Sequence, residues 1–123
     1  MKLKFILMKV MYVTSSAFPP PSVKYWRSDQ SQDDAVITIG TSATYNETQM
    51  CEEPSNQVAQ NLFRDPGFTH TVEMVYVVPD RRYFYCVGSD EHEWSKVFSF
   101  QSAPDYSRTV RFVVFGDTGR KHL

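Results

Sequence analysis

Residues 68–78 read FTHTVEMVYVV, and this run decides the fold class. Apolar and polar side chains alternate along it, and β-branched and aromatic residues are frequent, which is the pattern of a strand with one buried face. The positions expected to point inward are Phe68, His70 or a neighbour, Val72 and Met74. The turn sequences Asp65-Pro66-Gly67 and Pro79-Asp80 bound the run on either side.

Shorter runs of the same kind lie on both sides of this strand. The further strands expected in the first hundred residues are 8–15, 22–27, 35–40, 83–87 and 94–101. Turn signals at a spacing of roughly 8 to 12 residues indicate a β-sandwich. No helical period separates the strands, which argues against a doubly wound α/β domain. Residues 41–63 show neither the helical period of 3.6 residues nor the strand period of 2. They are expected to form an irregular excursion with at most one turn of helix.

Composition sets the class of protein and excludes two kinds of partner. A chain of 123 residues fits one domain that buries about two thirds of its unfolded surface. Hydrophobic residues make up 41% of it, so it can form a core. The net charge of -1 gives no electrostatic footprint for nucleic acid or for an anionic membrane. The sequence contains no run of about 18 apolar residues, so no membrane span is expected.

Three further features bear on cellular compartment. Residues 1–16 hold two lysines and an apolar run, but Lys9 interrupts that run and no small-residue cleavage site follows, so they predict a strand rather than a signal peptide. Cys51 and Cys86 match no metal-binding or redox spacing. The sequence leaves two possibilities open, that they are buried free thiols or that they form a disulfide. The sequon that begins at Asn46 is a glycosylation candidate if the protein is exported.

The stretch 110–119, VRFVVFGDTG, differs in kind from the strands before it. Residues 110–115 are apolar on both faces, as in a strand of a sheet that is covered on both sides. The sequence therefore predicts a sandwich over 1–103, a linker over 104–109 and the start of a second, α/β domain over 110–123. A Gly-Asp-x-Gly turn ends the stretch, with Asp117 between Gly116 and Gly119.

In this order and spacing, the motifs resemble the amino-terminal part of the plant-type, two-domain purple acid phosphatases. The motifs are ATYNETQMC at 43–51, Asp-Pro-Gly followed by His70-Thr71, Pro79 with Tyr83-x-Tyr85, Trp94-Ser95, and the turn 116–119. The resemblance implies an all-β, fibronectin type III-like antiparallel β-sandwich, followed by the first strand of a truncated α/β metallophosphoesterase domain. It also implies that the sandwich lacks its first strand, or that residues 1–7 replace it.

In that family the turn supplies one carboxylate to a dinuclear metal site, and the matching residue here is Asp117. Gly116 and Gly119 let the backbone bend tightly around metal and phosphate. The resemblance implies iron plus zinc, manganese or a second iron. The two ions polarise the phosphoryl group and lower the pKa of a bound water. The implied substrate is a phosphate monoester, hydrolysed at acidic pH outside the cell or in a vacuole.

One ligand does not make such a site. The family's further ligand motifs do not occur in these 123 residues, and His70, His92 and His122 are not expected to replace them. The chain alone is therefore expected to bind neither metal and to be catalytically inactive. The alternative function is a free-standing fibronectin-like binding module, and the resemblance leaves a homodimer open.

Overall fold

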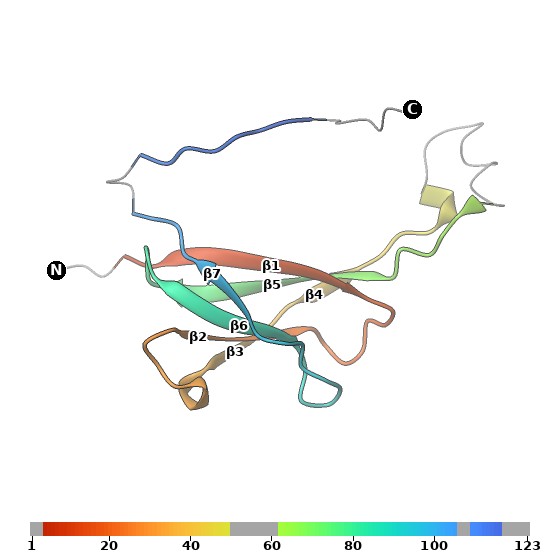
Figure 1. The fold of residues 1–123 in the computed structure, drawn as a ribbon. Coiled ribbons are helices and arrows are strands. Elements are labelled where there is room, and N and C mark those ends of the chain that lie inside the picture. Colours follow the sequence, from red (N-terminus) through yellow and green to blue (C-terminus); the bar gives the residue numbers. More distant parts are fainter. Residues whose placement is uncertain (1–3, 50–61, 106–108, 117–123) are drawn as a thin grey trace, which may run out of the picture.

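Two antiparallel sheets face each other in the computed structural model, which describes residues 4–49, 62–105 and 109–116 (Figure 1). The first sheet has the order β1-β5-β4, and the second has the order β3-β2-β6-β7. The strands of the first sheet are β1 (Ile6–Thr14), β5 (Phe68–Val77) and β4 (Thr41–Ala43). Those of the second are β3 (Val36–Ile39), β2 (Ser22–Arg27), β6 (Arg82–Gly88) and β7 (Phe98–Gln101). The all-β, two-sheet prediction is confirmed.

The core lies between the two sheets and follows the alternation read from the sequence. Its buried side chains are Val23 and Tyr25 from β2, Val72, Met74 and Val77 from β5, and Tyr83 from β6. Of the inward positions expected on residues 68–78, His70, Val72 and Met74 are buried, while Phe68 at the start of the strand is partly exposed. The Tyr83 hydroxyl accepts a hydrogen bond from the backbone N–H of Val78 at 2.9 Å.

A β-bulge interrupts the pairing of β1 with β5. Ile6 pairs with Val77 and Met8 with Met74, so β5 carries one more residue than β1 across this interval. Tyr76 lies in the bulge with a φ of 56°. The Tyr25 hydroxyl reaches across from the other sheet, donates to the Val75 carbonyl at 2.8 Å and accepts from the Val75 N–H at 3.0 Å. One side chain thereby pairs both backbone groups of a bulge residue and ties the two sheets together.

Residues 41–43 form a strand that the sequence did not predict. Strand β3 belongs to the second sheet and β4 to the first, and Gly40 alone lies between them. A Cβ atom on Gly40 would lie 2.1 Å from the carbonyl oxygen of Thr71, so only glycine fits this crossing. The short 3-10 helix η2 (Glu47–Gln49) follows, as the expected turn of helix, and η1 (Gln32–Asp34) lies between β2 and β3.

The carboxyl-terminal apolar run, predicted to be the first strand of a second domain, forms no strand in this structure. Residues 109–116, here called the tail, form no strand, and the exposed fractions of Val110 and Val114 are 57% and 82%. A strand requires backbone partners and a layer over each face, and no described residue supplies either to the tail. In Figure 1 the tail runs clear of the sandwich as an extended blue segment. The division into 1–103, 104–109 and 110–123 stays a prediction.

The other boundaries differ from the sequence-based ranges by a few residues. Strand β1 starts at Ile6 rather than at residue 8. Of the expected strand 94–101, only β7 forms, while Trp94 makes an isolated bridge with Gly88. The Trp94 indole donates to an Asp90 carboxylate oxygen at 2.9 Å, and the Lys24 ammonium lies 4.4 Å from the centre of the indole ring. Trp94 is therefore a packing residue of the β6–β7 connection.

Candidate functional site

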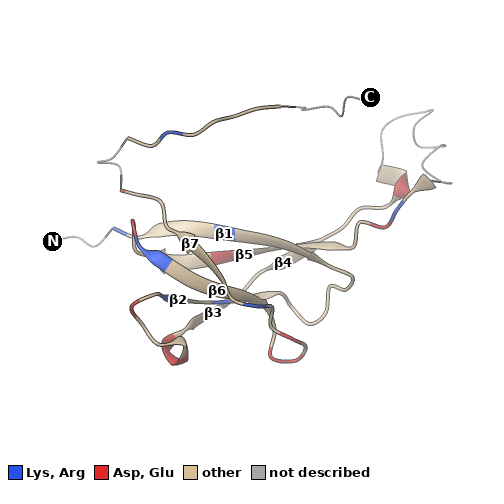
Figure 2. Cartoon of the chain, viewed as in Figure 1, with Lys and Arg blue, Asp and Glu red and all other residues tan. Residues whose placement is uncertain are grey.

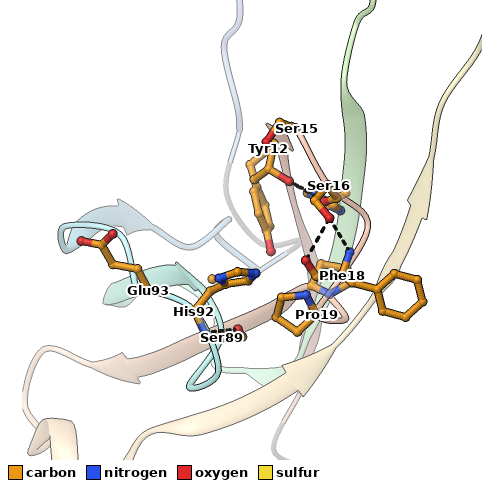
Figure 3. A pocket seen from close by; sticks show the side chains of 12 residues that line it. Tyr12, Ser15, Ser16, Phe18, Pro19, Ser89, His92 and Glu93 are labelled. Atoms are coloured by element: carbon orange, nitrogen blue, oxygen red, sulfur yellow. Dashed lines mark hydrogen bonds between the residues drawn. The ribbon is translucent and has the colours of Figure 1, made fainter.

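A hollow of about 280 Å³ opens at the end of the sandwich where β1 and β6 finish (Figure 3). Strand β1 contributes Tyr12 and Thr14, and the loop after it contributes Ser16, Phe18 and Pro19. The loop after β6 adds Ser89, His92 and Glu93, and His70 of β5 closes the base. In Figure 3 the Tyr12 and His92 rings both point into the hollow, whereas Glu93 points away from it.

Hydroxyl groups fix the Phe18–Pro19 side of the hollow and its far rim. The Ser16 hydroxyl donates to the Phe18 carbonyl at 3.1 Å and accepts from the Phe18 N–H at 3.2 Å. On the opposite side, the Ser89 hydroxyl accepts from the backbone N–H of His92 at 3.2 Å. Burial raises the pKa of the Tyr12 phenol, so this group stays protonated and neutral at neutral pH.

His70 lies at the base of the hollow and is 2% exposed. Its Nε2 is 2.6 Å from the Thr14 hydroxyl, and its Nδ1 is 2.7 Å from the Ser42 hydroxyl. The Thr14 hydroxyl donates its one hydrogen to the Ser16 carbonyl at 2.8 Å, so it accepts from His70. The network thus assigns the hydrogen of neutral His70 to Nε2, and Nδ1 accepts from Ser42. Burial lowers the pKa of His70, which favours this neutral form.

The Ser42–His70 pair has the elements of an activated nucleophile, but its surroundings do not support that role. In a nucleophilic serine site, a carboxylate or a similar group orients the far side of the imidazole. Here that position is taken by the hydroxyl of Thr14. Because His70 sits on the central strand of the first sheet and bonds side chains of β1 and β4, the arrangement fixes three strands against one another.

Of the residues expected to serve a metal site, only Gly116 lies within the described residues, and it does not line this hollow. Gly116 is exposed at the end of the tail, while Asp117, Gly119 and His122 lie outside the described residues. His92 lies in an exposed loop. Within residues 4–49, 62–105 and 109–116, no three His, Cys, Asp or Glu side chains lie close enough together to hold a metal ion.

The remaining candidates occupy different places. Asn46 is exposed, and its side-chain oxygen accepts from the Thr48 N–H at 3.0 Å and from the Thr48 hydroxyl, so the sequon is presented on the surface. Cys86 is buried, and burial raises the pKa of its thiol. Cys51 lies outside the described residues, so its pairing stays open. In the described parts of the chain, no helix is long and apolar enough to cross a membrane.

Charge does not mark a further site on the sandwich. Figure 2 shows the acidic residues mainly in turns and at strand ends, away from the sheet faces. Among the described residues, the ion pairs Lys9 with Glu73 at 3.3 Å and Arg27 with Asp29 at 2.7 Å are open to solvent. Exposed pairs of this kind contribute little to stability.

Comparison with known proteins identifies the family to which the sandwich belongs. The purple acid phosphatase N-terminal domain matches residues 7–102, which run from β1 through β7. The chain belongs to the purple acid phosphatase family. Its motifs had predicted this membership, and the match confirms it.

Curated relatives within the family share about a third of the aligned residues. Probable inactive purple acid phosphatase 24 of Arabidopsis thaliana is 33% identical over 114 residues, which cover 77% of this chain and 18% of the relative. Probable inactive purple acid phosphatase 9 of the same plant is 31% identical over 112 residues, which cover 91% of this chain and 16% of the relative. The chain thus spans less than a fifth of the length of these purple acid phosphatases.

A solved structure gives the same fold. The purple acid phosphatase PPD1 from yellow lupin (Lupinus luteus) seeds superposes with a TM-score of 0.70 over 89% of this chain and 19% of its own, at 22% identity. The two-sheet architecture is therefore that of a purple acid phosphatase N-terminal domain.

Sequence reasoning missed the hollow and the role of His70. The hollow is made by two loops and two strands that are far apart in the chain, and no local pattern reports such a convergence. His70 did have a signal, since it falls on the inward face of the alternating run 68–78. A polar residue at an inward position predicts buried hydrogen-bond partners, although it does not name them.

Proposed function

We propose that this chain is the non-catalytic, fibronectin type III-like sandwich that precedes the catalytic domain in a purple acid phosphatase. The observation that carries the proposal is the course of the chain after β7. The family match ends at residue 102, and the tail that follows covers no part of the sandwich. An apolar segment left uncovered by its own domain is suited to pair within another domain.

In the longer protein, residues 110–115 would form the first strand of the metallophosphoesterase sheet. Asp117 would then supply the first ligand to iron plus a second divalent ion, zinc, manganese or iron. Bound metals supply the Lewis acid and the activated water for hydrolysis of a phosphate monoester at acidic pH.

The same proposal places the protein outside the cell or in a vacuole, with Asn46 glycosylated. The exposure of the sequon supports this placement. The test is expression in a secreting eukaryotic host, with and without peptide N-glycosidase treatment. A loss of apparent mass that also disappears in Asn46→Gln is expected, whereas an unmodified secreted chain would contradict it.

The catalytic part of the proposal is tested on the 123-residue chain itself. The chain is incubated at acidic pH with Fe³⁺ and Zn²⁺, desalted, analysed for bound metal and assayed with p-nitrophenyl phosphate. We expect neither stoichiometric metal nor turnover above the blank, because the ligand set is incomplete. Asp117→Asn is the matched control and should behave identically. Two tightly bound metals per chain, together with turnover that Asp117→Asn abolishes, would show that the chain holds a complete site.

A second candidate is a free-standing interaction module with no catalytic domain. The names of the relatives, which are described as probable inactive purple acid phosphatases, favour the non-catalytic role that this candidate implies. Sequencing the transcript on both sides of the 123 codons separates the two candidates. An open frame that continues into further metal-ligand motifs supports the phosphatase. Stop codons at both ends support the module.

A further inference from the structure

Strand β1 is an outer strand of the first sheet and presents a long unpaired edge. It is nine residues long, and the sheet order β1-β5-β4 leaves its outer side without a neighbouring strand among the described residues. In an antiparallel pair, alternate residues direct N–H and C=O away from their partner, so this edge offers a row of hydrogen-bonding groups. Charged side chains and proline usually protect such an edge from pairing with another chain. Strand β1 has only one charged side chain, Lys9, and no proline.

The seam beside this edge is open and apolar. The inward side chains of β1 are only half-buried, and two hollows of about 490 and 560 Å³ flank the strand. Pro79 and Pro104 line the first hollow, and Tyr85, Val87 and Phe98 line the second. A strand added at the edge of β1 would place alternate side chains in these hollows while its backbone pairs with β1.

The tail supplies a strand of matching chemistry. Residues 110–115, VRFVVF, contain Arg111 as their one charged residue and neither glycine nor proline. Six-residue segments with high β-propensity and low charge pair readily with exposed edges. In Figure 2 this segment is a tan ribbon with a single blue band. Five of its six side chains, which are Val110, Phe112, Val113, Val114 and Phe115, are 57% to 82% exposed.

Both faces of the segment are apolar, and among the described edges only β1 matches it in length and chemistry. The other edge strands, β3, β4 and β7, have four, three and four residues. On β1 the outward side chains Leu7, Met11 and Val13 are exposed and apolar, while Ile6, Met8 and Val10 face inward. A partner strand with two apolar faces can therefore find apolar neighbours on both sides.

We propose that two copies of the chain pair by exchange, with residues 110–115 of each copy adding as a strand to the β1 edge of the other. In the structure the exposed tail does not pair with the β1 edge of its own copy, and a second copy carries the same segment. Each copy has one such edge and one such segment, so the exchange closes as a two-fold dimer. In the longer protein of the proposed function the catalytic sheet would take up residues 110–115, so this inference goes beyond that function and concerns the 123-residue chain by itself.

The test measures the mass of the 123-residue chain by light scattering over a concentration series in reducing buffer. A dimer is expected, and hydrogen exchange should slow at the outward amides of β1 as the dimer forms. Mixing two differently tagged chains should yield a heterodimer. The double variant Phe112→Lys/Val114→Lys should raise the dissociation constant about tenfold or more, since it places charges in the apolar seam. The sandwich itself is untouched by these tail substitutions.

Matched variants locate the interface. Met11→Lys, on the outward face of β1, should weaken the dimer, while Ile39→Lys, an equally exposed apolar position on β3, should leave it unchanged. Three results would overturn the proposal: a monomer at every concentration, protection of β1 amides within a monomer, or an assembly that ignores the tail substitutions. None of these results depends on metal binding or phosphatase activity, so they leave the proposed function to its own test.

Discussion

At the scale of single residues, the Tyr25 hydroxyl performs a task that a backbone partner performs elsewhere in the sheet. The bulge in β5 leaves the N–H and C=O of Val75 without ladder partners, and this hydroxyl bonds both, at 3.0 and 2.8 Å. Tyr25 itself is 3% exposed, so water cannot easily replace it. The bulge thus depends on one side chain from the opposite sheet.

Tyr25→Phe is expected to lower the free energy of unfolding by about 1 to 3 kcal/mol. The substitution leaves the N–H and the C=O of Val75 without a hydrogen-bond partner. Urea unfolding followed by fluorescence measures the change. Tyr85→Phe is the matched control, since the Tyr85 ring packs against Phe98 and Phe100 and its ring contacts survive the substitution. Equal losses in the two variants would show that the hydroxyl–bulge contact has no special weight.

The environment of His70 leads us to expect that the free energy of unfolding depends on pH. Burial lowers its pKa below the ordinary value of 6.5, so below about that pH the unfolded chain binds a proton that the folded chain excludes. Stability is therefore present above this range and is lost as pH falls through it. Protonation at Nδ1 would also displace the hydrogen that Ser42 donates there.

Urea midpoints measured from about pH 7.5 to about pH 5 should fall for the parent chain. The slope should flatten in His70→Gln, although this variant starts less stable because one or both bonds to Thr14 and Ser42 are lost. His92→Gln, in the exposed loop, should keep the parent slope. A parent slope retained in His70→Gln would assign the dependence to another group.

At the scale of elements, the crossing at Gly40 lets one continuous segment belong to both sheets. Gly40→Ala is expected to destabilise the fold by about 1 to 3 kcal/mol, because the added methyl would meet the Thr71 carbonyl oxygen and backbone must shift. Thermal unfolding measures the loss. Gly116→Ala is the matched control, since nothing lies within 4 Å of its Cβ position, and it should leave the midpoint unchanged.

Elements with a strong local period could be predicted from sequence, and those made by long-range contacts could not. The alternation along residues 68–78 places His70, Val72 and Met74 inside, as observed. Strand β4 has only three residues, and its place is set by pairing with β5, which no local pattern reports. Residues 110–115 show the reverse case, because a strong strand signal forms no strand where the described chain provides no partner.

The same division applies to the candidate site. The Gly-Asp-x-Gly turn is local, so residues 116–119 could be found by their pattern, and their role stays a prediction. The hollow bounded by Tyr12, Phe18 and His92 depends on the meeting of distant loops, and sequence patterns gave no access to it. The hollow could be recognised only once the fold had brought these residues together.

At the scale of the whole molecule, hydrogen bonds at Ser102 anchor the chain to the sandwich before the tail begins. This residue is 1% exposed, its hydroxyl donates to the Val78 carbonyl at 2.7 Å, and it accepts from the Arg81 N–H at 2.9 Å. The Asp80 N–H bonds the Ala103 carbonyl at 3.1 Å, next along the chain. These bonds fasten the end of β7 to the β5–β6 turn.

A chain that ends at Asp105 should therefore unfold at the same temperature as the monomeric full chain and below the tail-exchanged dimer, and it should remain soluble at higher concentration, because only the exposed apolar tail is removed. Ser102→Ala in the full chain should cost about 1 kcal/mol, since it leaves the Arg81 N–H and the partly buried Val78 carbonyl without this partner. Differential scanning calorimetry and solubility limits measure both effects. A midpoint for the shortened chain below that of the monomeric full chain would mean that the tail packs on its own sandwich.

This fastening has a mechanical consequence. A pulling force applied to the tail would reach the sandwich first at residues 102–103, where it loads the bonds to the β5–β6 turn before it can peel β7 from β6. A load on the tail thus enters the sandwich at a clamped point. The bonds at residues 102 and 103 bear it before the register of the described strands changes.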